Sequence, residues 1–270
     1  MRHFRTPLQL VAFCMSASAL AAQNADSTNA DKTFFTRRDL VLTGVALLGS
    51  AGVSVFDERI ARWTRSPSVQ GGTSRHDLVK SLTVVNEVPL TIGAVALYGI
   101  GRLSGSDVTA KVGLHATEAL VLTVATSELI RGPLGRSRPR VSPDDPYKFS
   151  FGGGFTDFGK RSFPSLHSAV GFATASVLTG ELNERHPGAV PYVAPVLYAA
   201  ALVPGVTRMY LDQHWASDVV AGAFLGTLLG SRVVSYAYSH HPSKIERALL
   251  AVTVAPAGHG GFIVAKSFGN

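Results

Sequence analysis

Six apolar stretches, separated by polar loops, dominate the pattern along the chain. They are Leu40–Phe56, Val88–Gly101, Val112–Ile130, Ser168–Leu182, Tyr192–Val206 and Val219–Tyr238. Each is rich in small apolar residues, which allow helices to pack closely in lipid or in a soluble bundle. A bilayer-spanning helix needs about 20 mostly apolar residues, so these lengths are borderline for spans. The pattern predicts an all-α fold in which six helices surround one core.

The first residues have the pattern of an export signal. Arg2 and Arg5 precede an apolar run from Leu8 to Leu20, as in a secretory signal peptide. We therefore predict a signal peptide at residues 1–22, with an uncleaved membrane anchor as the alternative. The only cysteine, Cys14, lies inside this segment. A cleaved protein would therefore have no thiol for disulfide or thiolate chemistry.

The remaining boundaries follow from changes in composition. Residues 23–37 are small and polar and are predicted to form a linker. The helical domain is predicted at residues 38–242. In the tail, residues 243–270, short strand-like runs begin at Leu249 and Phe262 and enclose a turn-forming segment. This pattern predicts a C-terminal β-hairpin, with a partly ordered tail as the alternative.

The charge of the chain favours anionic partners. Charged residues make up only 16% of the chain, which is typical of a helical protein in or against lipid. The formal net charge is +7, and this sign suits nucleic acid, an anionic membrane surface or a phosphate ester. Charge alone does not choose among these three partners.

Two polar clusters lie where apolar stretches end or begin. Arg131 and Arg138 follow the third stretch, and Pro139 would end any helix there. Ser165 and His167 stand at the start of the fourth stretch. Unpaired backbone N–H groups at a helix start attract anions, so these two side chains are well placed beside one. Taken singly, the simpler interpretations are a solvated basic loop and an ordinary helix cap.

A third cluster joins the fifth and sixth stretches. His214 and Asp218 are four residues apart, so they would share one face of a helix. An Asp218 carboxylate that accepts the Nδ1–H of His214 would leave Nε2 with an outward lone pair. Such a histidine is a base or a nucleophile, although a surface ion pair is the simpler interpretation of the pair alone.

The three clusters together have a chemistry that none has alone. The side chains of Arg131, Arg138 and Arg208 would bind the oxygens of a phosphoryl group, because guanidinium is planar, bidentate and always charged. Ser165 would add a neutral donor, and His167 would protonate the leaving oxygen. Converging arginines repel one another unless an anion joins them. The motifs therefore predict a phosphorylated lipid or small phosphate ester as partner, rather than nucleic acid.

At these residues the sequence resembles the superfamily of type 2 phosphatidic acid phosphatases and vanadium haloperoxidases. That family carries the motifs Lys-x6-Arg-Pro, Pro-Ser-Gly-His and Ser-Arg-x5-His-x3-Asp, in this order. The corresponding segments here read Arg131-x6-Arg138-Pro139, Pro164-Ser165-Leu166-His167 and Thr207-Arg208-x5-His214-x3-Asp218. The resemblance spans residues 131–218, and the ordered set of three motifs makes it specific.

The resemblance implies a role for each matching residue. His214 is similar to the nucleophile that forms a phosphohistidine, Asp218 to its orienting partner, and His167 to the general acid. The positions that match phosphate-binding residues are Arg131, Arg138, Ser165, Leu166 and Arg208. The resemblance implies no metal and no other cofactor.

The sequence departs from the family pattern at three positions. Arg131 stands in place of lysine, Thr207 in place of serine, and Leu166 in place of glycine. Leu166 keeps its backbone N–H, but a positive φ there would be costly and its side chain would narrow the pocket. The simplest interpretation of Glu128, one turn before Arg131, is that it positions that arginine, and no functional role is assigned to it. No role is assigned to Glu87, His115 or Glu118.

We therefore predict a phosphatase of phosphatidic acid or isoprenyl diphosphate type in a bacterial cell envelope, with its site facing the periplasm. The alternatives are a soluble periplasmic acid phosphatase, a non-catalytic membrane protein that binds anionic lipid, a phosphotransferase and a vanadate-dependent halide oxidase. Three full crossings would place Arg131 in the cytoplasm. A periplasmic site therefore requires one early stretch, such as Leu40–Phe56, not to span, or a soluble bundle. The oligomeric state is left open.

Overall fold

Each of the six apolar stretches lies inside one long helix of the computed structural model, except that the first runs two residues beyond its helix; the structure describes residues 33–257 and 261–266. These helices are α2 (Arg37–Ser54), α6 (Glu87–Ser104), α7 (Asp107–Leu134), α8 (Leu166–Arg185), α9 (Val190–Tyr210) and α10 (Ala216–Ser239). Thr36, Asn86, Ser106 and Ser165 begin four of them, because each side chain accepts a hydrogen bond from a first-turn N–H. The predicted all-α class is confirmed.

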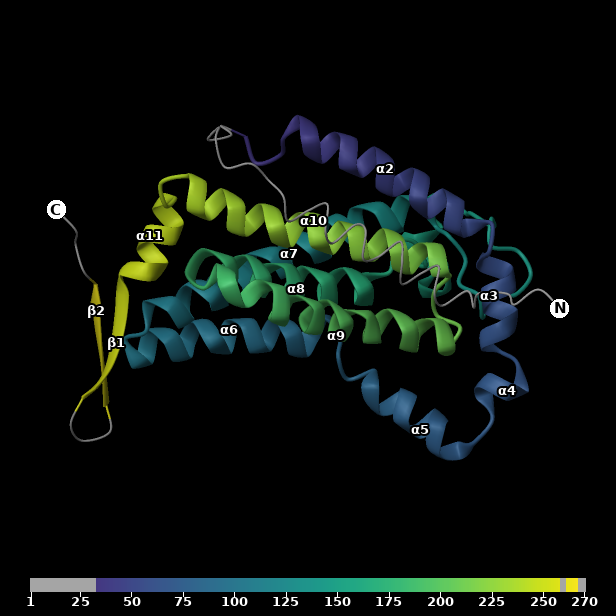
Figure 1. Cartoon of the computed structure of the whole chain (residues 1–270), viewed down its shortest axis with the longest axis horizontal. Coiled ribbons are helices and arrows are strands. Elements are labelled where there is room, and N and C mark those ends of the chain that lie inside the picture. Colours follow the sequence, from purple (N-terminus) through teal and green to yellow (C-terminus); the bar gives the residue numbers. More distant parts are fainter. Residues whose placement is uncertain (1–32, 258–260, 267–270) are drawn as a thin grey trace.

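Short helices add to the predicted six. They are α3 (Asp57–Thr64), α4 (Pro67–Gln70), α5 (Thr73–Leu82) and α11 (Lys244–Ala251), with the 3₁₀ turns η1 (Gly153–Phe155), η2 (Phe158–Lys160) and η3 (Pro187–Ala189). None of them contains a long apolar stretch, so the pattern of hydrophobic positions did not reveal them. In Figure 1, α3, α4 and α5 form a chain of short helices beside the bundle.

The strands β1 (Val252–Ala257) and β2 (Gly261–Lys266) pair in an antiparallel hairpin. The first strand was predicted to start at Leu249, but that residue lies in the last turn of α11. The hairpin and α3 lie at opposite ends of the molecule (Figure 1). The predicted signal peptide at residues 1–22 and most of the predicted linker lie outside the described residues.

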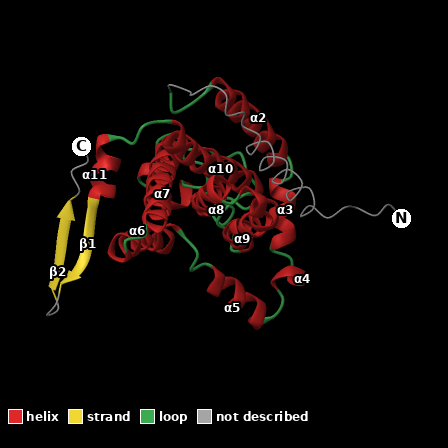
Figure 2. Ribbon diagram, turned by 60° about the vertical axis from the view of Figure 1, so that its left-hand side comes forward, coloured by secondary structure: helices red, strands yellow, loops and turns green. Residues whose placement is uncertain are grey.

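Helix α8 lies in the middle of the bundle and packs against α7, α9 and α10 (Figure 2). The backbones of α8 and α10 approach closely, because a Cβ at Gly226 would overlap the carbonyl oxygen of Ala169. A Cβ at Gly222 would likewise overlap the carbonyl oxygen of Ser165. The backbone N–H of Ser165 donates to the carbonyl oxygen of Asp218 over 2.9 Å. Close packing therefore brings the second and third sequence motifs together.

Among the described residues, three helices are long and apolar enough to cross a membrane, namely α7, α9 with the preceding turn, and α10. Two bent helix pairs, α2 with α3 and α5 with α6, would raise this number to five if each formed one span. Leu40, Val45 and Leu48 of α2 are exposed, as expected of side chains that face lipid. The chain is therefore a membrane-associated protein.

Candidate active site

Four helix ends meet at the candidate site. The last turns of α7 and α9 carry Arg131 and Arg208, and the first turn of α8 carries His167. His214 lies just before α10. Helix α7 stops at Leu134 because Gly135 takes a left-handed conformation, with φ of 60°. A Cβ at Gly135 would overlap the carbonyl oxygen of Ser150, so only glycine fits at this helix end.

His214 is buried, and its ring is oriented by a main-chain acceptor. Its Nδ1–H donates to the carbonyl oxygen of Ser162 over 2.7 Å. The predicted acceptor, Asp218, lies 3.7 Å from the same nitrogen, which is beyond hydrogen-bond distance. The tautomer is nevertheless the expected one, and Nε2 has no hydrogen-bond partner among the described residues. Burial, with smaller effects of Arg138 and Arg131, lowers the pKa of His214 to about 4, so the ring is neutral at pH 7.

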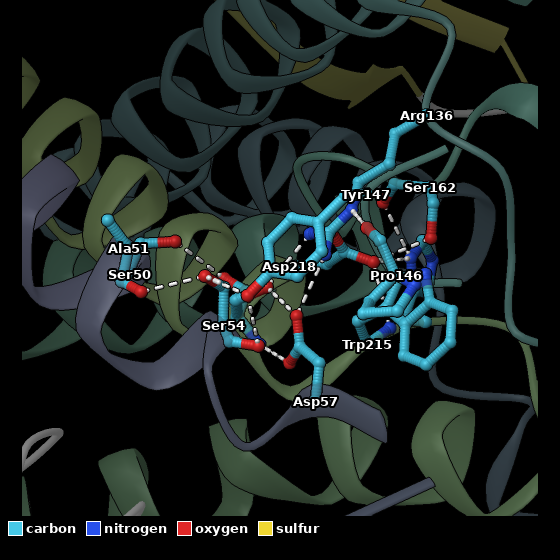
Figure 3. A network of polar contacts seen from close by, with 12 residues as sticks. Ser50, Ala51, Ser54, Asp57, Arg136, Pro146, Tyr147, Ser162, Trp215 and Asp218 are labelled. Carbon is cyan, nitrogen blue, oxygen red and sulfur yellow. Dashed lines mark hydrogen bonds and ion pairs between the residues drawn. The ribbon is translucent and has the colours of Figure 1, made fainter. Parts of the chain in front are cut away.

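Asp218 is occupied by other donors, which explains its distance from the ring (Figure 3). Oδ1 accepts from Nη1 of Arg136 over 2.6 Å. Oδ2 accepts from Oγ of Ser162 over 2.6 Å and from the backbone N–H of Trp215 over 2.8 Å. Asp218 therefore fixes both segments that flank the imidazole: Ser162, whose carbonyl accepts its proton, and the turn into α10.

Arg136 links this carboxylate to a second one, on α3 (Figure 3). Its Nη2 donates to Oδ2 of Asp57 over 2.8 Å, and its Nη1 also donates to Oγ of Ser217 over 2.8 Å. Its Nε donates to the carbonyl oxygen of Pro146 over 2.9 Å. Asp57 is fully buried. Neither Arg136 nor Asp57 was predicted from the sequence, and only the position of Asp57 directly after an apolar stretch could have indicated a special role.

Arg131 is held in place by a carboxylate of its own helix. Its Nη1 donates to Oε1 of Glu128 over 3.0 Å, and its Nε donates to the carbonyl oxygen of Arg161 over 3.1 Å. The other Glu128 oxygen pairs with the Arg161 side chain. This geometry fits the interpretation of Glu128 as the residue that positions Arg131.

Arg138 is buried, and its side chain is hydrogen-bonded to a neutral group rather than to a carboxylate. Its Nη1 donates to Oε1 of Gln213, and its guanidinium carbon lies 4.3 Å from the centre of the Phe158 ring. Nε and Nη2 have no hydrogen-bond partner in the part of the chain that the structure describes. Burial and then Arg131, Arg140 and Arg208 lower the pKa of Arg138 to about 9. A buried cation with free donors and cationic neighbours is suited to bind an anion.

His167 and Arg208 contact each other directly. Nη2 of Arg208 donates to Nε2 of His167 over 2.6 Å, and the His167 ring lies 6.1 Å from the His214 ring. Burial, followed by the nearby arginines and His214, lowers the pKa of His167 to about 2. His167 is therefore neutral before an anion binds. Glu87, at the start of α6, places Oε2 3.8 Å from Nε2 of His167, a contact that the sequence analysis missed.

Ser165 and Leu166 form the start of α8. The Ser165 hydroxyl oxygen accepts from the backbone N–H of Ser168 over 3.4 Å, so the residue is a helix cap, and its own hydroxyl proton remains available to an anion. Leu166 is the first helical residue and is buried. Asp212 is the only non-glycine residue with positive φ among those described, so Leu166 takes no strained conformation.

The structure thus brings the predicted residues of all three motifs to one end of the bundle. Within residues 33–257 and 261–266, no group of three or more His, Cys, Asp or Glu side chains could hold a metal ion. A buried histidine with a free Nε2, beside arginines with free donors, can attack a phosphorus atom and stabilise the oxygens around it.

A family model described as the PAP2 superfamily matches residues 113–242. A lipid A 1-phosphatase of Porphyromonas gingivalis is 37% identical over 84 residues, which are 31% of this chain and 18% of that protein. Lipid phosphate phosphatase 1 of Arabidopsis thaliana is 33% identical over 135 residues, 42% of this chain and 40% of the relative. A lipid A 4'-phosphatase of Bacteroides thetaiotaomicron is 30% identical over 128 residues, 43% of this chain and 51% of the relative. The chain thus matches about half or less of the length of each relative.

A comparison with solved structures gives a partial match. The match is the crystal structure of a transmembrane PAP2 type phosphatidylglycerolphosphate phosphatase from Bacillus subtilis. The TM-score is 0.47 at 20% sequence identity, and the alignment covers 84% of this chain and 93% of that protein.

Proposed function

We propose that this chain, whose residues 113–242 match the PAP2 superfamily model, is a lipid phosphate phosphatase of that superfamily. The observation that carries the proposal is Arg138, whose buried guanidinium has two N–H groups without a partner among the described residues. Arg131 and Arg208 are close enough to depress the pKa of Arg138. An oxyanion in this cluster would offset the repulsion and accept the free donors.

The proposed reaction has two displacement steps. Nε2 of His214 attacks the phosphorus atom, a P–N bond forms, and the bond to the leaving oxygen breaks. His167 gives its proton to that oxygen, then takes one from the water that attacks the phosphohistidine and releases phosphate. His167 is neutral in the free protein, so the negative charge of the substrate phosphate must raise its pKa before it can act as the acid.

The proposed substrate is a phosphatidic acid or an isoprenyl diphosphate, because the arginine cluster lies at the end of helices that are long and apolar enough to span a bilayer. Two relatives are named lipid A 1-phosphatase and lipid phosphate phosphatase 1, and both names indicate a phosphorylated lipid as substrate. We place the protein in a bacterial envelope with the site facing the periplasm, and expect turnover without a metal.

The decisive experiment compares His214→Ala with wild type, reconstituted in detergent micelles, on a panel of phosphatidic acid and isoprenyl diphosphate substrates. Losing the nucleophile should reduce turnover by at least about 10³-fold. The matched control is His241→Ala, at an exposed histidine beyond the end of α10. Mass spectrometry of wild-type protein quenched during turnover should find phosphate on His214, and turnover should survive a chelator.

Each rival has its own outcome in this experiment. Unchanged turnover in His214→Ala rejects the mechanism. Lipid binding without phosphate release by intact wild type points to a non-catalytic lipid-binding protein. Release of the protein by osmotic shock without detergent, together with turnover of small phosphate esters, points to a soluble acid phosphatase.

A further inference from the structure

Four phenylalanines are exposed on one stretch of the long loop between α7 and α8. The exposed fractions are 41% for Phe149, 83% for Phe151, 70% for Phe155 and 60% for Phe158. We call the segment Phe149–Phe158 the aromatic loop. Large apolar side chains rarely gather on a surface that faces only water, so the aromatic loop requires an apolar or interfacial partner.

The aromatic loop lies where the candidate spans end. It connects α7 to α8, and Arg138, which lies against Phe158, donates to Gln213 between α9 and α10. Within the described residues, α7, α9 and α10 are the three long apolar helices. Phenylalanine is apolar enough to enter the zone between headgroups and acyl chains that surrounds such helix ends. The aromatic loop therefore lies at the level along the helix axes where the bilayer surface is expected.

Two of the four rings border the arginine cluster. The Phe158 ring centre lies 4.3 Å from the guanidinium carbon of Arg138. The Phe155 ring covers the backbone of Gly132, next to Arg131, so closely that a Cβ at Gly132 would overlap it. A lipid surface that accepts these rings would therefore touch the edge of the candidate phosphate site.

The charges that flank the aromatic loop favour an anionic surface. Lys148 is exposed immediately before it, and Lys160 follows it, whereas the next basic residue, Arg161, is paired with Glu128. The acid within the loop is Asp157, which lies 3.7 Å from the ammonium group of Lys160. Basic side chains beside exposed aromatic rings are the combination that binds anionic leaflets.

The apolar surface continues from the loop to α2. A cavity of about 290 Å³ is lined by Tyr147 and Phe149, by Leu134 at the end of α7, and by Leu47 and Ala51 of α2. Arg136 and three serines supply its polar lining. An acyl chain at the loop would thus find apolar contacts that lead along the outside of the bundle.

We propose that the aromatic loop inserts into the headgroup region of an anionic leaflet and holds the arginine cluster at the lipid surface. The partner is the bilayer itself, because the loop combines span ends, exposed rings and basic flanks. The proposal rests on membrane association and not on the phosphatase chemistry, so either can fail without the other.

The test uses tryptophan fluorescence of the full chain in vesicles of phosphatidylcholine and phosphatidylglycerol that carry brominated acyl chains. The reporter is Phe151→Trp in a Trp63→Phe background, and the buried Trp215 gives a constant signal. The matched control is Asp144→Trp, at an exposed position of the same inter-helix loop that is followed by Asp145. Bromine should quench the Phe151→Trp reporter at least about twofold more than the control. Equal quenching at the two positions overturns the proposal.

The lipid composition tests the charge argument. Replacing phosphatidylglycerol by phosphatidylcholine should weaken the quenching of Phe151→Trp. Equal quenching in the two kinds of vesicle overturns the assignment to an anionic surface. A third measurement rests on the proposed function: Phe151→Asp should lower the ratio of turnover on vesicle-borne phosphatidic acid to turnover on a short-chain soluble analogue by about tenfold. An unchanged ratio contradicts the surface role, whereas wild type without turnover contradicts only the phosphatase.

Discussion

Arg136 and Arg138 are two residues apart and equally buried, yet their surroundings are opposite. The guanidinium of Arg136 donates to the carboxylates of Asp57 and Asp218, to a serine hydroxyl and to a main-chain carbonyl. Arg138 donates to the neutral side chain of Gln213 and keeps two N–H groups without a described partner. A buried charge is costly unless it is paired. Arg136 is therefore neutralised within the fold, whereas Arg138 is not, and this difference supports our proposal that Arg138 binds an anion.

The pKa values of the two arginines show the same contrast. Burial alone would lower the pKa of Arg136, but Asp218 and Asp57 outweigh it and raise that pKa above the ordinary value. The pKa of Arg138 falls to about 9, through burial and its cationic neighbours. Asp57 and Asp218 pair with Arg136 and not with Arg138, and this placement supports the proposed binding of an anion by Arg138.

The largest effect is expected where a paired charge is removed. Arg136→Met leaves Asp57 and Asp218 buried without their cation, so the free energy of unfolding should fall by about 3–5 kcal/mol. Urea unfolding in detergent micelles measures this change, with the exposed Arg140→Met as the matched control. Adding Asp57→Asn to Arg136→Met should recover part of the loss. A single variant as stable as wild type would contradict the structural role of Arg136.

Arg138→Met should give the reverse result. Removing a buried charge that lacks a carboxylate should leave the free energy of unfolding unchanged or raise it. Turnover of a lipid phosphate should instead fall by about 10²–10³-fold, because the phosphoryl oxygens lose a preorganised donor. Kinetics and urea unfolding on one preparation separate the two effects. A large decrease in the free energy of unfolding of Arg138→Met would contradict the claim that only Arg136 stabilises the fold.

A bound anion should stabilise the protein through Arg138. Orthovanadate at a hundredfold excess over its Kd should raise the free energy of unfolding of wild type by about 2.7 kcal/mol. The increase should disappear in Arg138→Met but persist in Arg62→Met, a control at an exposed arginine of α3. Thermal unfolding with and without vanadate measures both. An equal shift in wild type and Arg138→Met would place the anion elsewhere.

The contrast also shows what the sequence could and could not reveal. Arg138 was identified because Pro139 and the six-residue spacing from Arg131 form a motif. Residues of such a motif lie close together in the structure when the helix ends that carry them meet. Arg136 lies inside that motif without a distinguishing feature. Its partner Asp57 is 79 residues away in the sequence, on a short helix that the pattern of apolar residues does not predict. Pairings of this kind depend on tertiary packing, which local patterns do not encode.

The orientation of His214 was predictable only in part. The spacing of His214 and Asp218 indicated which nitrogen would be protonated, and the structure agrees. The acceptor differs, because the Asp218 oxygens are already used by Arg136, Ser162 and Trp215. The sequence shows which groups are near each other but not which donors compete for one carboxylate. Glu87, too, reaches His167 only because α6 begins beside α8.

The smallest predicted effect is a shift in the titration of His214. Its folded pKa, about 4, lies below the ordinary value of 6.5, and Arg138 contributes to the depression after burial. Protonation of His214 is thus favoured in the unfolded chain, so stability from this group is present above about pH 6.5 and is lost as the pH falls toward 4. Arg138→Met should raise the folded pKa by up to about one unit, since one nearby positive charge is removed.

This shift can be measured by NMR titration of ring-labelled histidine in detergent micelles, with the His214 signal assigned from its absence in His214→Gln. Arg136→Met is the informative counterpart. Without the Arg136 cation, the Asp218 carboxylate should attract the His214 imidazolium more strongly, so the His214 pKa should again rise. In this variant the free energy of unfolding should fall as well. If the His214 pKa changed in Arg136→Met but not in Arg138→Met, the Arg138 guanidinium would not share a pocket with the imidazole. Arg138 would then not be part of an anion site with His214.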